Sequence, residues 1–435
     1  MKIALITSFP PSRHALNEYG FHVAEQLRQE RHIDLTVLGD YLPAPAEELP
    51  GFKVDRCWGF GKAGNVVTLL RAIQRVKPDV AWFNLGFASF GARPLSAMLG
   101  LAAPAAARLT GAYSHVTLHQ LFETVDLRDA AVTSPRLYRL GGWLATHLLL
   151  SANSLSVLMP AYRQTLDEKY GRGRVNVRSH GIFAGKPDPP DFTRRGNPTH
   201  SILAFGKWGT YKRLELLIEA FEQVAARFPN LKLVIGGGDH PKTPGYVQSM
   251  AQRHASDRIR FLGYVPEESI ADLFREASLA VMPYTSSAGS SGVAHLAAQY
   301  GVPVIASGIP DFRELAEHEG IAMRFFTPGD TGSLVEQLLL ALNSPSELKQ
   351  MAWQSYAAGL AMSMPLVVRE YVRSFRQQER IKTLQSAADL RRAGQFRRSE
   401  ELARTVGEKI QKWQDEDEPP VPATEPCAVV NPAAA

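Results

Sequence analysis

Two lysines flank a glycine-containing loop, and their spacing suits the binding of an anion. The segment FGKWGTYKR at residues 205–213 places lysines at 207 and 212, and apolar residues then recur at helical spacing. A helix N-terminus that follows a strand and a loop attracts phosphate, because its first N–H groups have no partner within the helix. We therefore predict a diphosphate site at Gly206, with Lys207 and Lys212 as exposed, catalytic loop cations. A solvated surface turn is the alternative.

A second loop rich in small residues follows the apolar run at 279–282 and leads into another helix. Its glycines allow a close approach of the backbone, and its serine hydroxyls can donate to phosphate or sugar oxygens. Simple capping of the helix by Ser290 or Ser291 is the alternative. Two such loops at the carboxyl ends of strands predict one ligand crevice. The residues expected to contact the ligand are Pro283, Tyr284, Ser290, Ser291, Gly292 and Val293.

The first half of the chain offers a polar loop and two histidines. Tyr19 and Gly20 lie where that loop enters an expected helix, and His119 and His180 each end a strand-like run. A single histidine is most often a hydrogen-bonded structural residue, but two at strand ends can face one cleft. The lysine loop lacks Walker spacing and the GGGD at 236–239 lacks dinucleotide-binding spacing, which disfavours an ATPase and a dehydrogenase.

Alternating strands and helices are expected to position these loops. Short apolar runs alternate with longer amphipathic stretches, which is typical of βαβ units and parallel sheets. We predict an α/β protein with two Rossmann-like domains, at 1–183 and 200–361, joined by a Pro-rich linker at 184–199. The predicted strands are 3–7, 35–38, 80–83, 116–118 and 155–158 in the first domain, and 202–205, 231–235, 259–262, 279–282 and 303–306 in the second.

The C-terminal part of the sequence is expected to be helical and then disordered. Residues 362–414 carry charges every few positions, and residues 415–435 are acidic and then rich in Pro and Ala. The helices are expected either to pack on their own domain or to bind a partner, including a second copy of the chain. Their apolar stripe consists of Leu384, Leu390, Leu402, Val406 and Ile410.

Composition excludes several classes of protein. Of 435 residues, 45% are hydrophobic and 21% are charged, which excludes a fibrous or wholly disordered chain. The net charge of +5 is too small for a dedicated nucleic-acid binder, so no nucleic-acid partner is expected. The two cysteines allow neither a disulfide framework nor a cysteine-based zinc site.

The lengths of the apolar stretches indicate whether the chain is expected to enter or cross a membrane. The first apolar run is too short for a signal peptide, and no stretch has the roughly 20 apolar residues of a spanning helix. A cytoplasmic protein is therefore expected. The most apolar stretch, residues 94–107, lies between Arg93 and Arg108 and is expected to be a buried helix. A helix resting on an anionic membrane surface is the alternative.

Taken in order, these motifs resemble the retaining nucleotide-sugar glycosyltransferases of family four, over nearly all of the expected folded chain. The family carries a basic residue and a lysine five positions later, matched by Lys207 and Lys212, and a histidine beside the donor sugar, matched by His119. Its G-x-P-V-[IV]-A-[ST] motif is matched at 301–307. Its segment that meets the nucleotide base is matched at 262–265, which adds Gly263 and Tyr264 to the expected site.

The resemblance implies a GT-B fold, in which two Rossmann-like domains face a central cleft. It implies a hexosyltransferase-like enzyme of bacterial polysaccharide biosynthesis, with a nucleotide-diphospho-sugar as donor substrate and neither a cofactor nor a metal ion. The leaving phosphate would take the acceptor proton. The acceptor, held by the first domain, would be a glycan, a lipid-linked molecule or a small molecule. Lipid-linked acceptors imply peripheral contact with the inner face of a membrane.

Two departures from the family pattern leave other functions open. The family's paired glutamates fall at Ala288 and Leu296, and its first-loop Gly-Gly is Tyr19-Gly20. Serine hydroxyls and backbone N–H groups would then hold the sugar hydroxyls. The missing carboxylates also suit a catalytically silent protein that acts as a binding or assembly partner. An epimerase or a phosphorylase on the same fold is a third interpretation.

Overall fold

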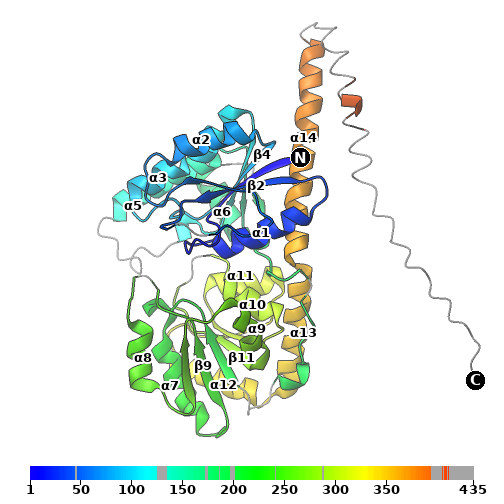
Figure 1. The fold of residues 1–435 in the computed structure, drawn as a ribbon. Helices are drawn as coiled ribbons and strands as arrows, with labels where there is room; N and C mark the ends of the chain where they lie inside the picture. The colour runs from blue at the N-terminus through cyan, green and yellow to red at the C-terminus, as the bar shows by residue number, and fades with distance from the viewer. Residues whose placement is uncertain are drawn as a thin grey trace, which may run out of the picture. The chain divides into compact units, whose positions relative to one another are not determined.

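The computed structural model contains two parallel β-sheets with helices packed on them (Figure 1). The chain divides into two units, Met1–Tyr371 and Val372–Ala435, and both sheets belong to the first unit. The predicted linker at 184–199 falls between the two sheets. The structure describes residues 1–44, 47–124, 135–171, 175–185, 187–195, 201–240, 242–286 and 289–392, with residues 404, 406–408 and 410. The predicted disorder at 415–435 lies outside this range.

The first sheet has the strand order β3-β2-β1-β4-β5-β6-β7. Every residue of β4 is buried, so helices cover both faces, as is typical of parallel sheets. Its strands are β1 (Lys2–Ile6), β2 (Asp34–Asp40), β3 (Val54–Trp58), β4 (Val80–Leu85), β5 (Tyr113–Leu118), β6 (Ser154–Val157) and β7 (Val175–Val177). Its helices are α1 (Asn17–Gln29), α2 (Asn65–Val76), α3 (Pro94–Leu101), α4 (Ala103–Ala107), α5 (Pro135–Leu150) and α6 (Pro160–Tyr170), with short 3-10 turns η1 (Arg108–Thr110) and η2 (Phe122–Thr124).

The second sheet has the strand order β10-β9-β8-β11-β12-β13. Its strands are β8 (Ser201–Phe205), β9 (Lys232–Gly236), β10 (Ile259–Gly263), β11 (Ala277–Met282), β12 (Val304–Ser307) and β13 (Met323–Phe326). Its helices are α7 (Leu214–Ala225), α8 (Tyr246–His254), α9 (Glu267–Glu276), α10 (Gly292–Gln299), α11 (Pro310–Glu319), α12 (Thr331–Leu342) and α13 (Pro345–Ala361), with 3-10 turns η3 (Phe192–Arg194) before the sheet and η4 (Thr210–Lys212) within it.

Strand order reverses beside the first strand of each sheet, between β1 and β4 and between β8 and β11. At such a switch point the loops that leave neighbouring strands diverge to opposite faces, and a crevice forms at the carboxyl ends of the strands. Both loops predicted to bind an anion, after β8 and after β11, leave the second sheet at its switch point.

The ten predicted strands are all present, and three further strands escaped the sequence analysis: β3, β7 and β13. Each of these lies at the edge of a sheet. Edge strands are half exposed, so they lack the continuous apolar run by which a buried parallel strand is found. In β3, for example, three of the five residues are only partly buried and two of those are charged.

The apolar stretch at 94–107 corrects one expectation. It forms two helices, α3 and α4, which meet at Ala102 shortly before Pro104. Only one face is buried: Ala97 and Leu101 pack inward, while Leu95 is 65% exposed and Leu99 is 38% exposed. The expectation of one buried helix was therefore wrong.

The last helix, α14 (Met364–Arg392), begins in the first unit and ends in the second. Within the first unit, Tyr371 returns to the first sheet, where its hydroxyl accepts from Thr117 at 3.2 Å and its ring packs on Trp82. Within the second unit, Leu384 and Ile410 of the predicted stripe are exposed. Self-association through these helices stays a prediction. Leu390 and Leu402 fall outside the described side chains.

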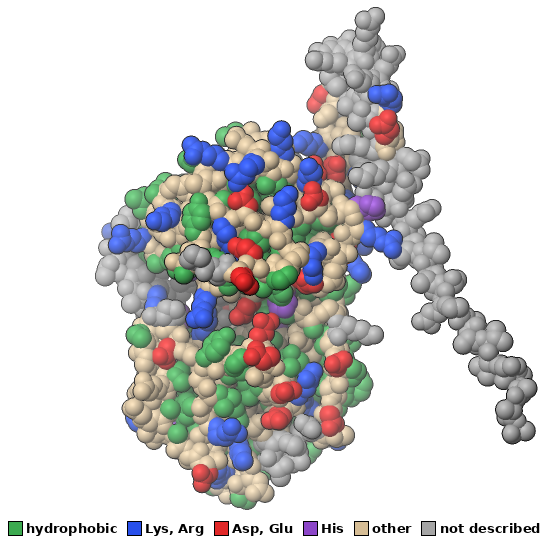
Figure 2. All heavy atoms as spheres, in the orientation of Figure 1, with side chains coloured by type: hydrophobic (Ala, Val, Ile, Leu, Met, Phe, Trp, Pro, Cys, Tyr) green, Lys and Arg blue, Asp and Glu red, His purple; other side chains and the backbone are tan. Residues whose placement is uncertain are grey.

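The surface in view carries charges of both signs, and none of the described helices could span a membrane. Figure 2 shows basic and acidic side chains interspersed on the face in view, with no extended field of one sign. Among the described residues, none of the helices combines the length and the apolar character required to cross a bilayer.

Candidate active site

Three loops of the second sheet pack backbone to backbone at its switch point. The N–H of Thr285 donates to the carbonyl of Tyr211 at 2.8 Å, and the N–H of Trp208 donates to the carbonyl of Gly238 at 2.8 Å. A Cβ on Gly237 would overlap the carbonyl oxygen of Gly206, so only glycine fits there. The lysine loop and the serine loop therefore lie side by side, and the ligand crevice expected there stays a prediction.

Lys212 is buried, with only 8% of its surface exposed, which corrects the expectation of an exposed loop cation. Its Nζ lies 4.5 Å from the ring centre of Tyr284 and 5.7 Å from that of Trp208. Among the described residues, neither a carboxylate nor a carbonyl pairs with this ammonium group. Burial lowers the pKa of Lys212. A buried, unpaired ammonium is unfavourable by itself and is suited to an anionic ligand.

Further positive groups surround Lys212. Lys207 is exposed at the other end of the loop. The pKa of His240 is lowered, first by burial and then by Lys242, Lys212 and Lys207. The three lysines therefore all lie near enough to His240 to disfavour its protonated form.

In and beside the serine loop, one hydroxyl caps a helix and two others have no hydrogen-bond partner among the described residues. Ser291 caps α10, since its Oγ accepts from the N–H of Ala294 at 3.4 Å. Ser290 Oγ and Tyr284 Oη are buried and have no hydrogen-bond partner among the described residues. Burial raises the pKa of Tyr284, which keeps its hydroxyl protonated and able to donate. The capping alternative therefore holds for Ser291, while Ser290 and Tyr284 are left for a ligand.

The neighbouring predicted residues belong to the same loops of the second half. Val293, in the first turn of α10, lies 3.4 Å from where a Cβ on Gly206 would sit, and Lys212 Nζ lies 2.7 Å from that point. Pro283 is buried directly after β11, and Gly292 is exposed at the start of α10. A side chain at position 206 would thus collide with the proposed anion site.

His119 follows β5 and is buried in the first half of the chain. Its Nε2 lies 2.6 Å from Oδ1 of Asn84, whose amide nitrogen donates to Thr7 at 3.1 Å. Because the amide oxygen faces the ring, Nε2 of His119 carries the proton. Burial lowers the pKa of His119 to about 3, so the ring is neutral at pH 7.

The two predicted histidines meet around Tyr19. The ring of Tyr19 lies 4.4 Å from that of His119 and 4.8 Å from that of His180. The hydroxyl of Tyr19 is buried without a hydrogen-bond partner among the described residues. Burial, followed by the nearby His295 and His119, holds the pKa of His180 well below its usual value. The two histidines therefore pack around one tyrosine, and their place in a ligand cleft stays a prediction.

His295 of α10 was missed by the sequence analysis. Its ring lies 4.6 Å from His180. Its Nδ1 lies 2.8 Å from the carbonyl of Ser291 and its Nε2 lies 2.8 Å from Glu319. Burial by itself would lower the pKa of His295, but Glu319 and the Ser291 carbonyl outweigh it and raise the pKa. His295 therefore links the serine loop to α11 and to the histidines of the first half.

The two halves of the chain touch at the serine loop. A Cβ on Gly289 would lie 2.8 Å from the carbonyl oxygen of His119. Gly289 has a φ of +111°, which few residues other than glycine adopt. The serine loop of the second half thus lies directly against the end of β5 in the first half.

The remaining predicted site residues are Gly20, Gly263 and Tyr264. A Cβ on Gly20 would lie 2.5 Å from Thr7 Oγ1, so this glycine lets α1 pack closely on the end of β1. The carbonyl of Gly263 accepts from the N–H of Gly237 at 2.7 Å, which places 262–265 beside the glycine loop. Tyr264 is 82% exposed. In the described part of the chain no group of three or more His, Cys, Asp or Glu side chains is arranged to hold a metal ion.

By fold and site, this is a two-sheet α/β protein in which the lysine loop and the serine loop meet at the switch point of the second sheet. Residues 199–344 match the family described as glycosyl transferases group 1. Mannosylfructose-phosphate synthase of Agrobacterium fabrum is 28% identical over 150 residues, which is 30% of this chain and 33% of that protein. Phosphatidyl-myo-inositol mannosyltransferase of Propionibacterium freudenreichii is 26% identical over 177 residues, 40% of this chain and 43% of that protein.

Solved structures show the same fold along most of the chain. Sucrose-phosphate synthase from Thermosynechococcus elongatus superposes with a TM-score of 0.66 at 17% identity, covering 87% of this chain and 98% of that one. Anabaena HepE in complex with UDP-glucose superposes with a TM-score of 0.63 at 16% identity, covering 87% and 100%. These likenesses confirm the predicted GT-B fold. In sequence, the matched stretches span only a third to under half of the two relatives named above.

Proposed function

We propose that the protein is a metal-independent glycosyltransferase that moves a hexose from a nucleotide-diphospho-sugar to an acceptor and retains the anomeric configuration. The buried, unpaired ammonium of Lys212, in the segment that matches the group 1 family, carries this proposal. A diphosphate would supply its missing counter-ion. Lys207 and the N-terminal turn of α10 would add positive potential. No cofactor is needed in this scheme.

The reaction would proceed on one face of the donor sugar. The bond from the anomeric carbon to the diphosphate breaks, the acceptor oxygen bonds to that carbon from the same side, and the acceptor proton passes to the leaving phosphate. Lys212 would stabilise the charge that develops on the phosphate. The unpartnered hydroxyls of Ser290 and Tyr284 would donate to sugar or phosphate oxygens. These hydroxyls would take the place of the glutamates that are absent at 288 and 296.

The relatives support a hexose donor. The Anabaena HepE structure was determined with UDP-glucose, and the Propionibacterium relative is named a mannosyltransferase. The backbone carbonyl of His119 lies against Gly289 of the serine loop, and its neutral ring would contact a hydroxyl of that hexose.

A panel of nucleotides tests the donor site. We expect one of UDP, GDP and ADP to raise the melting temperature, because a ligand at 100 times its dissociation constant adds about 2.7 kcal/mol. The matching nucleotide sugars should be hydrolysed slowly without an acceptor. Binding without any turnover would favour the catalytically silent protein, and no shift with any nucleotide would refute the donor site.

An apolar and basic face on the first half supports an acceptor at a membrane, on its inner side. Helices α3 and α5 pack together (Figure 1) and expose six large hydrophobic side chains. Arginines at 93, 136 and 139 are exposed on the same two helices or at their ends. Such a face suits an anionic lipid interface, where apolar side chains insert and arginines meet headgroups. The exposed hydrophobic residues are Leu95 (65% exposed), Leu99 (38%), Tyr138 (37%), Leu140 (54%), Trp143 (47%) and Leu144 (40%).

Sedimentation with liposomes tests this face. The protein should bind vesicles that contain anionic phosphatidylglycerol and should bind them less at high salt, because salt screens the arginines. Exchanging both Leu140 and Trp143 for serine should weaken binding at least tenfold, since each apolar side chain contributes roughly 1.5–3 kcal/mol on burial. Leu340→Ser is the matched control, because Leu340 is 44% exposed on α12 of the other half. Equal binding by the double variant would show that the face does not contact lipid.

A further inference from the structure

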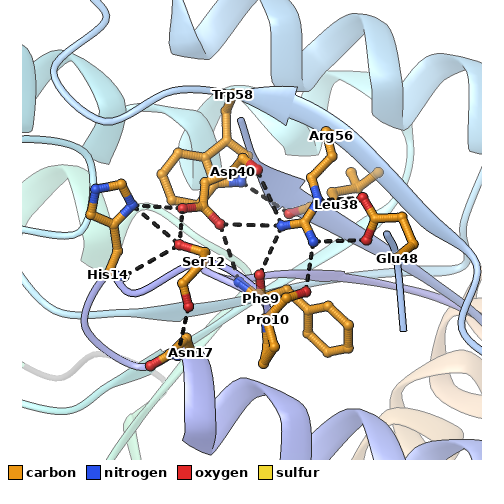
Figure 3. Close-up of polar contacts among 10 residues, drawn as sticks. All are labelled: Phe9, Pro10, Ser12, His14, Asn17, Leu38, Asp40, Glu48, Arg56 and Trp58. Atoms are coloured by element: carbon orange, nitrogen blue, oxygen red, sulfur yellow. Dashed lines mark hydrogen bonds and ion pairs between the residues drawn. The ribbon is translucent and has the colours of Figure 1, made fainter. Parts of the chain in front are cut away.

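A polar cluster at the carboxyl ends of β1 and β2 is not used by the proposed chemistry (Figure 3). Its centre is Asp40, the last residue of β2, whose side chain is fully buried. The Oδ2 atom of Asp40 accepts from Ser12 Oγ and from His14 Nδ1, each at 2.6 Å. Its Oδ1 atom accepts from the N–H of Phe9 at 3.1 Å and lies 3.6 Å from Arg56. The cluster fixes the loop that follows β1.

The contacts of His14 determine which of its two ring nitrogens carries a proton. A carboxylate only accepts, so Nδ1 of His14 carries the proton that it shares with Asp40. In the neutral ring, Nε2 is then an acceptor on the opposite side. Among the described residues Nε2 has no hydrogen-bond partner, and the side chain is 38% exposed. Asp40 thus holds the ring with an unused acceptor directed away from the buried cluster.

The cluster is not a nucleophilic triad, although it contains Ser, His and Asp. Ser12 Oγ donates to Asp40, and its contact with the ring is to Nδ1, at 3.3 Å. That nitrogen already donates to Asp40, so it cannot take a proton from the serine. The chemistry left to His14 is binding through Nε2.

Aromatic side chains lie beside this acceptor. The ring of His14 stacks on Phe60 with 4.7 Å between centres and 18° between planes. Phe60 is 41% exposed and Tyr41 is 47% exposed. A Cβ on Gly59 would touch both Tyr41 and Lys62, so these side chains border the same short segment. Exposed aromatic faces next to a fixed hydrogen-bond acceptor suit a ring that carries hydroxyls and has an apolar face, which describes a sugar.

The cluster lies on the reacting edge of the sheet but away from the reacting residues. His119 follows β5, and Asp40 ends β2 in the same parallel sheet, so both lie at carboxyl ends. The strand order places β4 and β1 between them. Three strand spacings of about 4.8 Å amount to about 14 Å. A ligand that reaches from one to the other is longer than a single sugar ring.

We propose that His14, Phe60 and Tyr41 form an acceptor subsite for a sugar ring remote from the hydroxyl that is glycosylated. The proposal rests on the proposed function and deepens it, because it makes the acceptor a glycan or glycoside rather than a small molecule. His14 Nε2 accepts a hydrogen bond from a hydroxyl of that ring, and the aromatic side chains pack on its apolar face. Asp40 is a positioning residue that acts through His14.

Two variants of His14 separate binding from support of the loop. In His14→Asn, the amide nitrogen takes the place of Nδ1 and can still donate to Asp40, while Nε2 is lost. We expect its melting temperature to match the wild type and its binding to an array of immobilised oligosaccharides to fall about tenfold, or ~1.4 kcal/mol. Phe60→Ala should weaken the same oligosaccharides by a similar factor. His14→Gln, which restores an acceptor at the distance of Nε2, should recover part of the loss.

Transfer kinetics and a control complete the test. With the best-bound oligosaccharide as acceptor, His14→Asn should raise the acceptor KM and leave kcat unchanged, because the subsite holds ground state and transition state equally. The control is His254→Asn, since His254 also faces a carboxylate, Glu222 at 4.0 Å, and is 31% exposed in the other half. Unchanged oligosaccharide binding by His14→Asn, or no binding to the array by the wild type, overturns the subsite. Nucleotide binding reports separately on the donor site.

Discussion

Replacing Lys212 by methionine should stabilise the folded protein and at the same time remove its nucleotide site. Methionine can fill the space between the rings of Tyr284 and Trp208 that the lysine stem occupies. The exchange removes a buried ammonium that has no partner, so we expect unfolding to cost about 1–3 kcal/mol more. Nucleotide-diphosphate binding should weaken by about 1.5–3 kcal/mol, the range for a hydrogen bond to a charged group.

Catalysis should suffer more than binding. The charge on the diphosphate grows as the bond to the sugar breaks, and loss of one such stabilising group typically lowers kcat by about 10²–10³-fold. Thermal unfolding, calorimetry with the nucleotide diphosphate and turnover of the nucleotide sugar measure the three effects. Lys207→Met is the matched control: Lys207 is exposed, so its stability should change by less than about 0.5 kcal/mol. A Lys212 variant with wild-type nucleotide affinity would remove this residue from the site.

The pH dependence of nucleotide-diphosphate binding gives an independent test of the role of Lys212 in that binding. An anion prefers the ammonium form, so affinity falls as pH rises through the pKa of Lys212 in the unliganded protein. Burial lowers that pKa, so the fall should begin at a lower pH than an ordinary lysine would cause. The pH dependence should disappear in Lys212→Met and persist in Lys207→Met.

The sequence predicted the anion loops because backbone geometry has a local signature. A strand, a run of small residues and an amphipathic helix can be read within about twenty residues, as at 205–228 and 279–299. The orientation of a side chain within such a loop cannot be read in this way. The turn η4 directs Lys212 inward, while Lys207, five residues earlier, stays exposed.

Residues whose role depends on contacts between distant segments escaped detection. Asn84 sits within the apolar strand β4 and His295 within the small, apolar helix α10, so each looked like part of a buried element. Their partners are 35 residues away in the case of His119 and Asn84, and 24 residues away, in α11, for His295 and Glu319. The one available signal was a polar side chain in an otherwise apolar run, because a buried polar group needs a partner.

The ends of β1 and β2 show the same limit of local reasoning. The loop that contains His14 was recognised as polar, but nothing in its own sequence indicates Asp40, 26 residues later, as the group that orients the ring. β3, which supplies Arg56 to this cluster, is an edge strand without a continuous apolar run. Parallel topology brings these three segments together, and topology follows from the whole sheet.

Replacing His119 by alanine should lower kcat and kcat/KM together by about 10²-fold, or ~2.7 kcal/mol. The ring is neutral and oriented by Asn84, and it lies where the end of β5 meets Gly289 of the serine loop. Its contact with a sugar hydroxyl should strengthen as the sugar ring flattens and positive charge builds at the anomeric carbon. Binding of the nucleotide diphosphate should stay nearly intact, because that part of the donor lies at Lys212. This is the pattern expected for a contact made mainly in the transition state.

His115→Ala is the matched control, because His115 is also buried and lies in β5, just before His119. It contacts Ser154 Oγ at 2.7 Å, and burial lowers its pKa to about 3, as for His119. His115 lies within β5, whereas His119 follows its carboxyl end. Both variants should lose stability by a similar amount, since each leaves a buried partner unsatisfied at a cost of about 1–3 kcal/mol. Only His119→Ala should lose turnover per folded molecule. If the two variants melt at similar temperatures and both keep wild-type specific activity, His119 is a structural histidine, and the donor-sugar contact assigned to the first half is wrong.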